Sequence, residues 1–140
     1  MKILLAVDGS AYTKKMLAYL VTHKDTFAGD NAFTLLTVQP AIPPRARSAL
    51  GKQVVEQYLL DEAERVLGPV TKFLLRHDIN AKSAWKVGQA GELIAKFADA
   101  GKFDLLVMGS HGHGALAIYF TGAECSKVIA LCGVPVLLVR

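Results

Sequence analysis

The sequence predicts an α/β fold in which one parallel sheet of five strands has helices on both faces. Five short apolar runs occupy residues 3–7, 32–38, 80–87, 104–108 and 134–139, and four segments with helical spacing of apolar residues separate them. Parallel neighbours in a sheet need crossover connections, and right-handed helical crossovers lie against its faces. The alternation of strand and helix therefore predicts a doubly wound parallel sheet.

The first two strands and two helices come from residues 1–76. Residues 3–7 form a continuous apolar run, as expected of a strand covered on both faces, and Asp8-Gly9-Ser10 ends it. Ser10 is expected to cap the helix that follows. The second strand leads into residues 39–51, whose three prolines predict a loop. An amphipathic helix is then expected over residues 54–74, with a kink or break at Gly68-Pro69.

The remaining three strands are expected within residues 80–139 and differ in their polar residues. In residues 80–87 Lys82 and Lys86 share one side, which favours the edge of a sheet because lysines discourage pairing with another chain. A helix follows Gly88-Gln-Ala-Gly91, and residues 104–108 form a short apolar strand before a glycine-rich segment. The last helix is expected to end at Cys132-Gly133, and residues 134–139 form the final strand.

Length and composition bound the class of protein. We expect residues 1–140 to form a single domain, and 52% hydrophobic with 20% charged residues is typical of a globular protein. No apolar run reaches the roughly 18–20 residues that span a bilayer, and the run after Lys2 is too short for a secretory signal, so we expect a cytoplasmic protein with no membrane partner. The net charge of +4 is scattered rather than gathered into a basic stripe, which disfavours nucleic acid as a partner. Cys125 and Cys132 lie too far apart on one expected helix for a disulfide and are expected to be reduced.

The glycine-rich segment is the clearest functional pattern. Gly109 directly follows a buried strand, where glycine lets the backbone pass close to a ligand. No Gly-Lys-Ser/Thr follows, and the order of the glycines differs from the dinucleotide fingerprint. The spacing of Gly109, Gly112 and Gly122 is instead G-x2-G-x9-G. This pattern resembles the ATP-binding members of the universal stress protein family, which carry G-x2-G-x9-G-[S/T] after the fourth strand.

The resemblance covers nearly the whole chain. Residues 3–10, ILLAVDGS, are similar to the family's opening strand, and residues 134–139, VPVLLV, are similar to its closing strand. The resemblance implies a Rossmann-like, HUP-type sheet with strand order 3-2-1-4-5, and that order places the strand with Lys82 and Lys86 at an edge. Asp8 and Gly109 would then face each other at the switch point, where open α/β sheets bind ligands.

The resemblance also implies which residues bind a nucleotide, ATP or AMP, with Mg2+ only as its companion. Asp8 resembles the family's aspartate that meets the adenosine, and Val38 the residue whose backbone meets the adenine. Plainer roles remain open, since an aspartate before Gly-Ser also forms turns and Val38 is an ordinary strand residue. The glycines would admit the ribose and phosphates, and the amides at the start of the last helix attract anions. The candidate nucleotide-binding residues are Asp8, Val38, Met108, Gly109, Gly112, Gly122 and Ala123.

Glu124, Arg45 and Arg47 are candidate modulators of phosphate binding, to which Ala123 of the candidate binding residues also contributes. Ala123 stands where the family has Ser or Thr and lacks the hydroxyl. Glu124 competes for the anion site, points to solvent or binds Mg2+ beside the phosphates. We therefore expect weak binding of ATP, with AMP less affected. Arg45 and Arg47 either reach a bound phosphate or are solvated.

The pair His111 and His113 suggests other chemistry. No nearby cysteine or acidic cluster completes a metal site. The pair is faintly similar to the His-x-Gly-His loop of nucleotidyl transferases, so a phosphoryl- or nucleotidyl-transferring enzyme is the alternative function. We expect instead a stress-response binding module with at most slow ATP hydrolysis. Its uncharged strand 134–139 would expose an apolar edge, which predicts a homodimer through that strand.

Overall fold

One sheet of parallel strands forms the centre of the protein. The computed structural model describes residues 1–27, 29–109 and 122–140, and of residues 122–124 only the helical backbone. The strands are β1 (Lys2–Ala6), β2 (Ala32–Gln39), β3 (Ala81–Val87), β4 (Leu105–Gly109) and β5 (Val136–Val139). All pairs are parallel, in the order β3-β2-β1-β4-β5. The predicted order and the edge position of the strand with Lys82 and Lys86 are confirmed.

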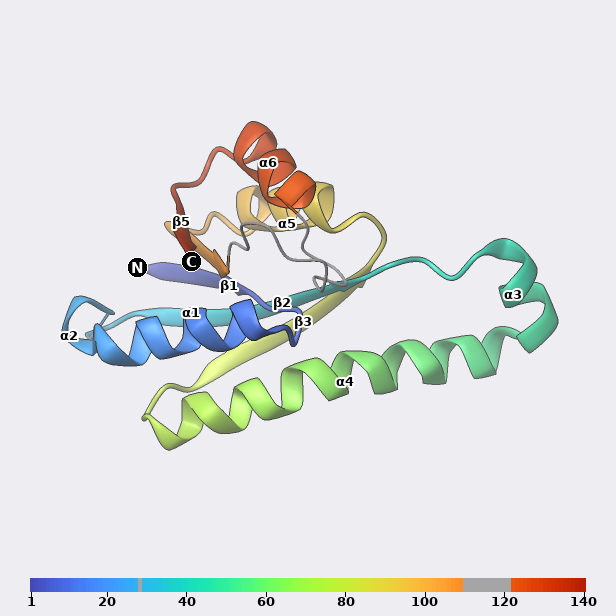
Figure 1. Ribbon diagram of the computed structural model, residues 1–140, viewed down its shortest axis with the longest axis horizontal. Helices are drawn as coiled ribbons and strands as arrows, with labels where there is room; N and C mark the ends of the chain where they lie inside the picture. The colour runs from blue at the N-terminus through green and yellow to red at the C-terminus, as the bar shows by residue number, and fades with distance from the viewer. Residues whose placement is uncertain (28, 110–121) are drawn as a thin grey trace.

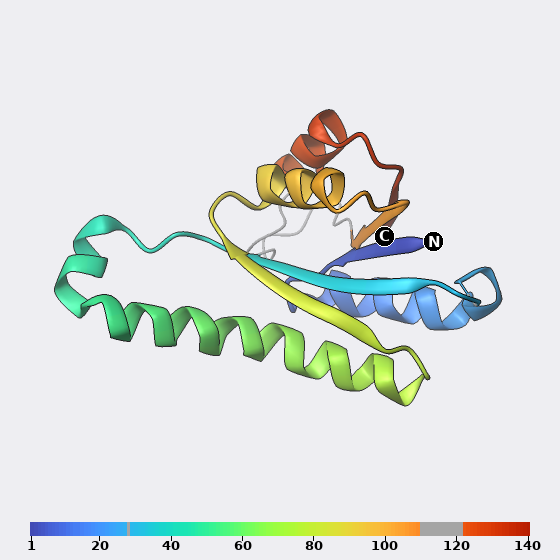
Figure 2. The same cartoon turned by 180° about the vertical axis from the view of Figure 1, so that it is seen from behind.

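Helices cover both faces of the sheet, as the alternation of elements predicts. Helices α1 (Ala11–Thr22) and α4 (Lys52–Arg76) lie on one face, and α5 (Ala90–Ala100) and α6 (Gly122–Leu131) lie on the other (Figure 1). The view from behind shows the same layers (Figure 2). Two short helices, α2 (Lys24–Phe27) and α3 (Pro44–Leu50), precede β2 and α4. No helix in the described ranges is both long and apolar enough to cross a membrane.

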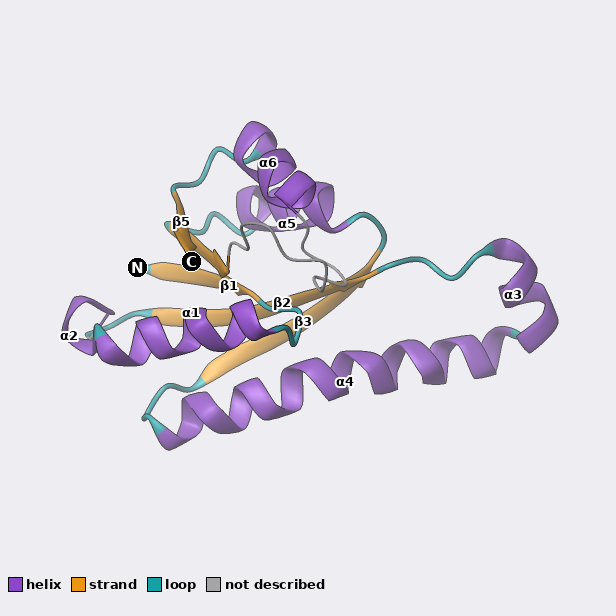
Figure 3. Cartoon of the chain, in the orientation of Figure 1, coloured by secondary structure: helices purple, strands orange, loops and turns teal. Residues whose placement is uncertain are grey.

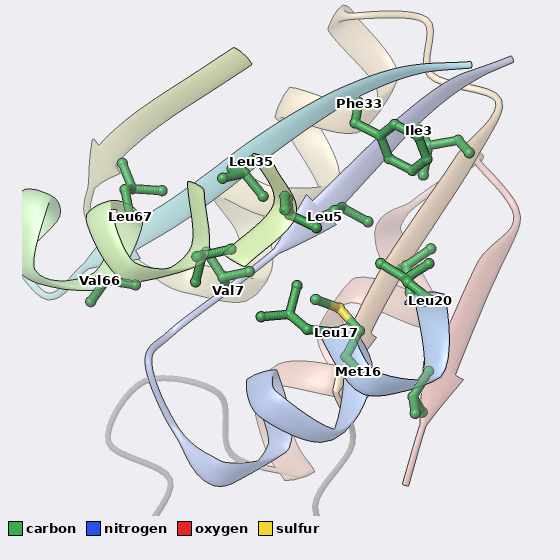
Figure 4. Packing of buried hydrophobic residues seen from close by; sticks show 14 of the residues in the cluster. Ile3, Leu5, Val7, Met16, Leu17, Leu20, Phe33, Leu35, Val66 and Leu67 are labelled. Carbon is green, nitrogen blue, oxygen red and sulfur yellow. The ribbon is translucent and has the colours of Figure 1, made fainter. Parts of the chain in front are cut away.

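Alternate residues of the central strands supply two separate cores, one on each face. Ile3, Leu5 and Val7 pack with α1 and α4, whereas Leu4 and Ala6 pack with α5 and α6. Figure 4 shows the first core, with Val7 at the end of β1 between side chains from α1 and α4. Because β1 is buried on both faces, its continuous apolar run is explained.

The loop expected over residues 44–50 and the break expected at Gly68-Pro69 are both wrong. Residues 44–50 of the expected loop form α3, in which Pro44 occupies the first helical positions, where its missing N–H breaks no hydrogen bond. Helix α4 continues through Gly68 and Pro69 without a break, although Pro69 cannot donate to the carbonyl of Arg65. Val66 and Val70, on either side of the proline, are buried in the core. Their packing holds the helix together where local propensity predicts its end.

The β2–α4 connection carries chain beyond the sheet. Figure 3 shows α3 and the beginning of α4 projecting past the carboxyl ends of the strands. The strand predicted at 134–139 begins at Val136, because the carbonyl of Pro135 accepts a hydrogen bond from Leu106 N but Pro135 has no N–H to donate.

Candidate functional site

The carboxyl ends of β1, β2 and β4 bring four of the predicted residues to one rim. Ala6 is level with Leu36 of β2 and with Met108 of β4. Asp8, two residues after Ala6, therefore lies level with Val38 of β2 and one residue beyond the level of Gly109 of β4. The neighbours of β1 are β2, which follows it in the chain, and β4, which lies on its other side. The strand order therefore reverses at β1, and this rim is the switch point of the sheet. The predicted placement of Asp8 and Gly109 on the same rim is confirmed.

Asp8 is held in place by the first turn of α1. The residue is 6% exposed, and its Oδ1 accepts hydrogen bonds from Ser10 N at 2.9 Å and Thr13 Oγ1 at 2.8 Å. Asp8 N in turn donates to Thr13 Oγ1 at 3.1 Å. The turn-forming role of Asp8 is thus real, but it uses only one carboxylate oxygen. Oδ2 has no hydrogen bond partner among the described residues, which leaves an acceptor beside the rim.

Ser10 does not cap α1 through its side chain, contrary to expectation. It occupies the N-cap position with an extended backbone, but its hydroxyl makes no capping hydrogen bond. The hydroxyl is buried and has no partner within the described part of the chain. Asp8 and Thr13 order this turn instead. Thr13, which is 3% exposed, is not among the residues predicted from sequence, and its only signal there is a hydroxyl five positions after the aspartate.

Val38 presents backbone rather than side chain to the rim. Its side chain is 1% exposed and packs in the core under α5 and α6, as does that of Met108. Leu36 O accepts from Val7 N on the β1 side, whereas Gln39 O accepts from Gly88 N on the β3 side. In a parallel strand these directions alternate from residue to residue, so the N–H and C=O of Val38 point towards the β1 side. Because β1 has already turned away at Asp8, these two groups face the rim.

Gly109 is a glycine for a structural reason that the motif does not reveal. A Cβ at this position would lie 2.6 Å from Tyr12 O and 2.8 Å from Tyr12 C, distances that side chains do not tolerate. The carbonyl of Gly109 also accepts a long contact, 4.0 Å, from Cys125 Sγ of α6. Gly109 therefore lets the start of α1 approach the end of β4 and shapes the rim between them.

The other predicted positions are placed less fully. Gly122 begins α6, with Ala123 and Glu124 in its first turn, while the side chains of 123 and 124 lie outside the described residues. Gly112, His111 and His113 lie outside them altogether.

The two arginine candidates lie elsewhere. Arg45 and Arg47 belong to α3, in the projecting segment that contacts α4 (Figure 1). Arg47 lines a surface hollow formed by α3 and the start of α4. Neither arginine is brought to the rim with Asp8 by any described contact.

Cys132 is a poor candidate for a nucleophile. Burial raises the pKa of the Cys132 thiol, a hydrogen bond with the backbone of Val134 opposes this shift, and the charge of Asp99 adds to it. A raised pKa lowers the thiolate fraction and so makes a poor nucleophile. Within the described ranges no cluster of three or more metal-ligating side chains occurs.

Comparison with known proteins decides the family. The model of the universal stress protein family matches residues 1–140. The chain belongs to the universal stress protein family. A universal stress protein of Thermus aquaticus, encoded in the QAH/OAS sulfhydrylase 3' region, is 31% identical over 139 residues, which are 99% of this chain and 97% of that protein.

Solved universal stress proteins share the fold. The protein from Archaeoglobus fulgidus in complex with dAMP superposes with a TM-score of 0.67 at 18% identity, covering 100% of this chain and 98% of its own. The Arabidopsis thaliana family protein with AMP bound has a TM-score of 0.68 at 17% identity, covering 99% of this chain and 90% of its own. These structures confirm the Rossmann-like architecture of the universal stress protein described above.

Proposed function

We propose that this universal stress protein is a binding module for an adenine nucleotide, held at the rim formed by Asp8, Val38 and Gly109. The observation that carries the proposal is the pair of backbone groups of Val38 facing the rim beside Asp8. One N–H donor next to one C=O acceptor complements the ring nitrogen and amino group of adenine. The AMP and dAMP complexes of related folds support a nucleotide of this class.

Each residue of the rim has a distinct role in this proposal. Oδ2 of Asp8 accepts a hydrogen bond from the adenosine, because a carboxylate whose other oxygen is already bonded is fixed in direction and strong as an acceptor. Thr13 is a positioning residue, since it holds Asp8 through two hydrogen bonds. The missing side chain of Gly109 lets the start of α1 pack against the end of β4, which fixes the shape of the rim.

The phosphates are proposed to lie towards the start of α6. Gly122 begins this helix, and the amides of a first turn attract anions. Ala123 offers no hydroxyl to a phosphate, and Glu124 adds a negative charge in the same turn. We therefore propose that a nucleoside monophosphate is preferred over ATP, with Mg2+ entering only with its nucleotide.

We further propose that two copies pair through β5. The two edges of the sheet differ, because β3 carries exposed Lys82 and Lys86 whereas β5 has no charged residue between Val136 and Val139. Unpaired backbone beside partly exposed apolar side chains is a surface that proteins cover. A symmetric contact between two β5 strands covers both edges at once.

Calorimetric titration of AMP tests the nucleotide site with a matched pair of variants. Asp8→Asn keeps the size of the side chain but replaces the free acceptor by an amide, and we expect AMP affinity to fall about tenfold or more. Asp104→Asn is the control, because Asp104 lies at the opposite end of the strands, where its Oδ2 accepts from Lys2 N at 2.7 Å. Wild type that fails to bind AMP at millimolar concentration, or equal affinity in both variants, would contradict the proposal.

A further inference from the structure

A second cavity lies between α1 and α4, on the face of the sheet away from Val38 and Met108. It measures about 510 Å³, a volume within the range of small-molecule sites. Its walls are largely apolar and are lined by Leu17, Val66, Pro69, Val70 and Phe73. Gly9, Ser10 and Thr13 border it on the β1–α1 side, and Lys14, Arg65 and Arg76 complete its lining. We refer to this cavity as the α1/α4 groove.

The groove exists because the two helices on this face are spread apart. Helix α1 packs on β4 and β5, and α4 packs on β2 and β3, so the strip above β1 lies between them. Figure 4 shows Leu17 on one side of Val7 and Val66 on the other. Pro69 is exposed on α4 within the lining. The gap is therefore a product of helix placement.

Positive charges surround the apolar walls and are only partly neutralised. Arg65 forms an ion pair with Glu62 at 3.0 Å. Lys14 and Arg76 have no carboxylate within ion-pair distance among the described residues, and no acidic side chain lines the groove. An apolar channel with two uncompensated cations complements a ligand with an apolar body and a negatively charged end.

The length of the groove narrows the class of ligand. Arg65 and Arg76 are eleven residues apart on one continuous helix, which corresponds to roughly 16 Å along its axis. A fully extended acyl chain advances about 1.3 Å per carbon, because its C–C bonds of about 1.5 Å follow a zigzag, so about a dozen carbons span roughly 14 Å, most of this distance. A planar nucleotide base does not need such a length of apolar wall, and Phe73, Val70 and Leu17 offer it no hydrogen bonds.

We propose that the α1/α4 groove binds a medium-chain fatty acid, with its carboxylate at Lys14 or Arg76 and its chain along Leu17, Val66, Val70 and Phe73. This site is separate from the proposed nucleotide site. The groove side chains belong to the core shared by α1 and α4, whereas Val38 and Met108 belong to the core under α5 and α6. Within the described residues, the β1–α1 turn and Thr13 border both.

The probe is sodium dodecanoate below its micellar concentration, titrated into the full chain and followed by calorimetry and by amide NMR shifts. We expect saturable binding of one molecule, with the largest shifts in α1 and α4 around Leu17 and Val70. Dodecyltrimethylammonium, which has the same chain and the opposite charge, is expected to bind at least tenfold more weakly. Equal binding of the two probes, or shifts centred on another face, would overturn the proposal. So would displacement of dodecanoate by AMP.

Substitution of Pro69 provides the sharpest variant. Pro69→Glu places a carboxylate in the groove while removing a residue unfavourable in a helix interior, so the fold is not put at risk. We expect dodecanoate affinity to fall at least tenfold in Pro69→Glu and to change less than threefold in Pro69→Gln. Unchanged affinity in Pro69→Glu rules the groove out.

Removal of the cations is an independent check. The double variant Lys14→Gln with Arg76→Gln is expected to lose dodecanoate affinity by about tenfold. The control is Lys15→Gln with Lys72→Gln, which removes the same charge from neighbouring exposed positions outside the groove. Equal losses in the two double variants would mean that only net charge attracts the probe, and the site would be refuted.

Discussion

Replacement of Gly109 by alanine tests how the rim is built. The added Cβ would lie 2.6 Å from Tyr12 O, 2.8 Å from Tyr12 C and 2.9 Å from Tyr12 Cβ. The first two are backbone atoms of α1, so rotation of a side chain cannot relieve the contact. Either α1 or the end of β4 must move, and such overpacking costs about 1–3 kcal/mol.

Equilibrium unfolding in urea measures this cost. With a slope of roughly 1–3 kcal/mol per molar urea, the midpoint of Gly109→Ala is expected about 1 M lower than that of wild type. Movement of α1 also displaces Thr13, which holds Asp8, so AMP affinity should fall together with stability.

A matched glycine serves as the control. A Cβ at Gly133 would lie 3.5 Å from Asp99 Oδ1, an ordinary contact, and its backbone does not require glycine. Gly133→Ala is therefore expected to change stability by less than about 1 kcal/mol. If Gly109→Ala unfolds at the same urea concentration as wild type and Gly133→Ala, the close approach of α1 to β4 is not a constraint and the reasoning fails.

Three further outcomes are expected. Ala123→Ser combined with Glu124→Val should raise ATP affinity about ten- to a hundredfold and AMP affinity less, as measured by calorimetry, and equal gains would contradict a role in phosphate recognition. Wild type should sediment as a dimer and Leu137→Lys as a monomer, whereas a lysine added to β3 should leave the dimer intact; a wild-type monomer at high micromolar concentration refutes pairing through β5. Asp99→Asn should lower the pKa of Cys132, because it removes a negative charge that disfavours the thiolate, so the pH profile of alkylation by iodoacetamide should shift to lower pH. An unshifted profile would mean that the charge of Asp99 does not act on Cys132.

The sequence determined the class of fold by itself and the location of the rim through its resemblance to a known family. Apolar runs of strand length and helical repeats are written locally, so the alternation of elements could be read without knowledge of their packing. Lys82 and Lys86 identified an edge strand because charge on alternate positions is likewise a local pattern. The resemblance to the universal stress protein family supplied the strand order that brings Asp8 and Val38 beside Gly109, because local patterns do not say which strands are neighbours.

Only the tertiary structure decided why particular residues stand at that rim. Gly109 is required by the backbone of Tyr12, almost a hundred positions earlier in the chain. Helix α4 passes through Pro69 because Val66 and Val70 are buried against the sheet, although local propensity favours an end there. The α1/α4 groove depends on which strands each helix covers. Such features arise from close packing between segments that are distant in sequence. A local sequence pattern does not specify which distant segments pack together, so it cannot predict them.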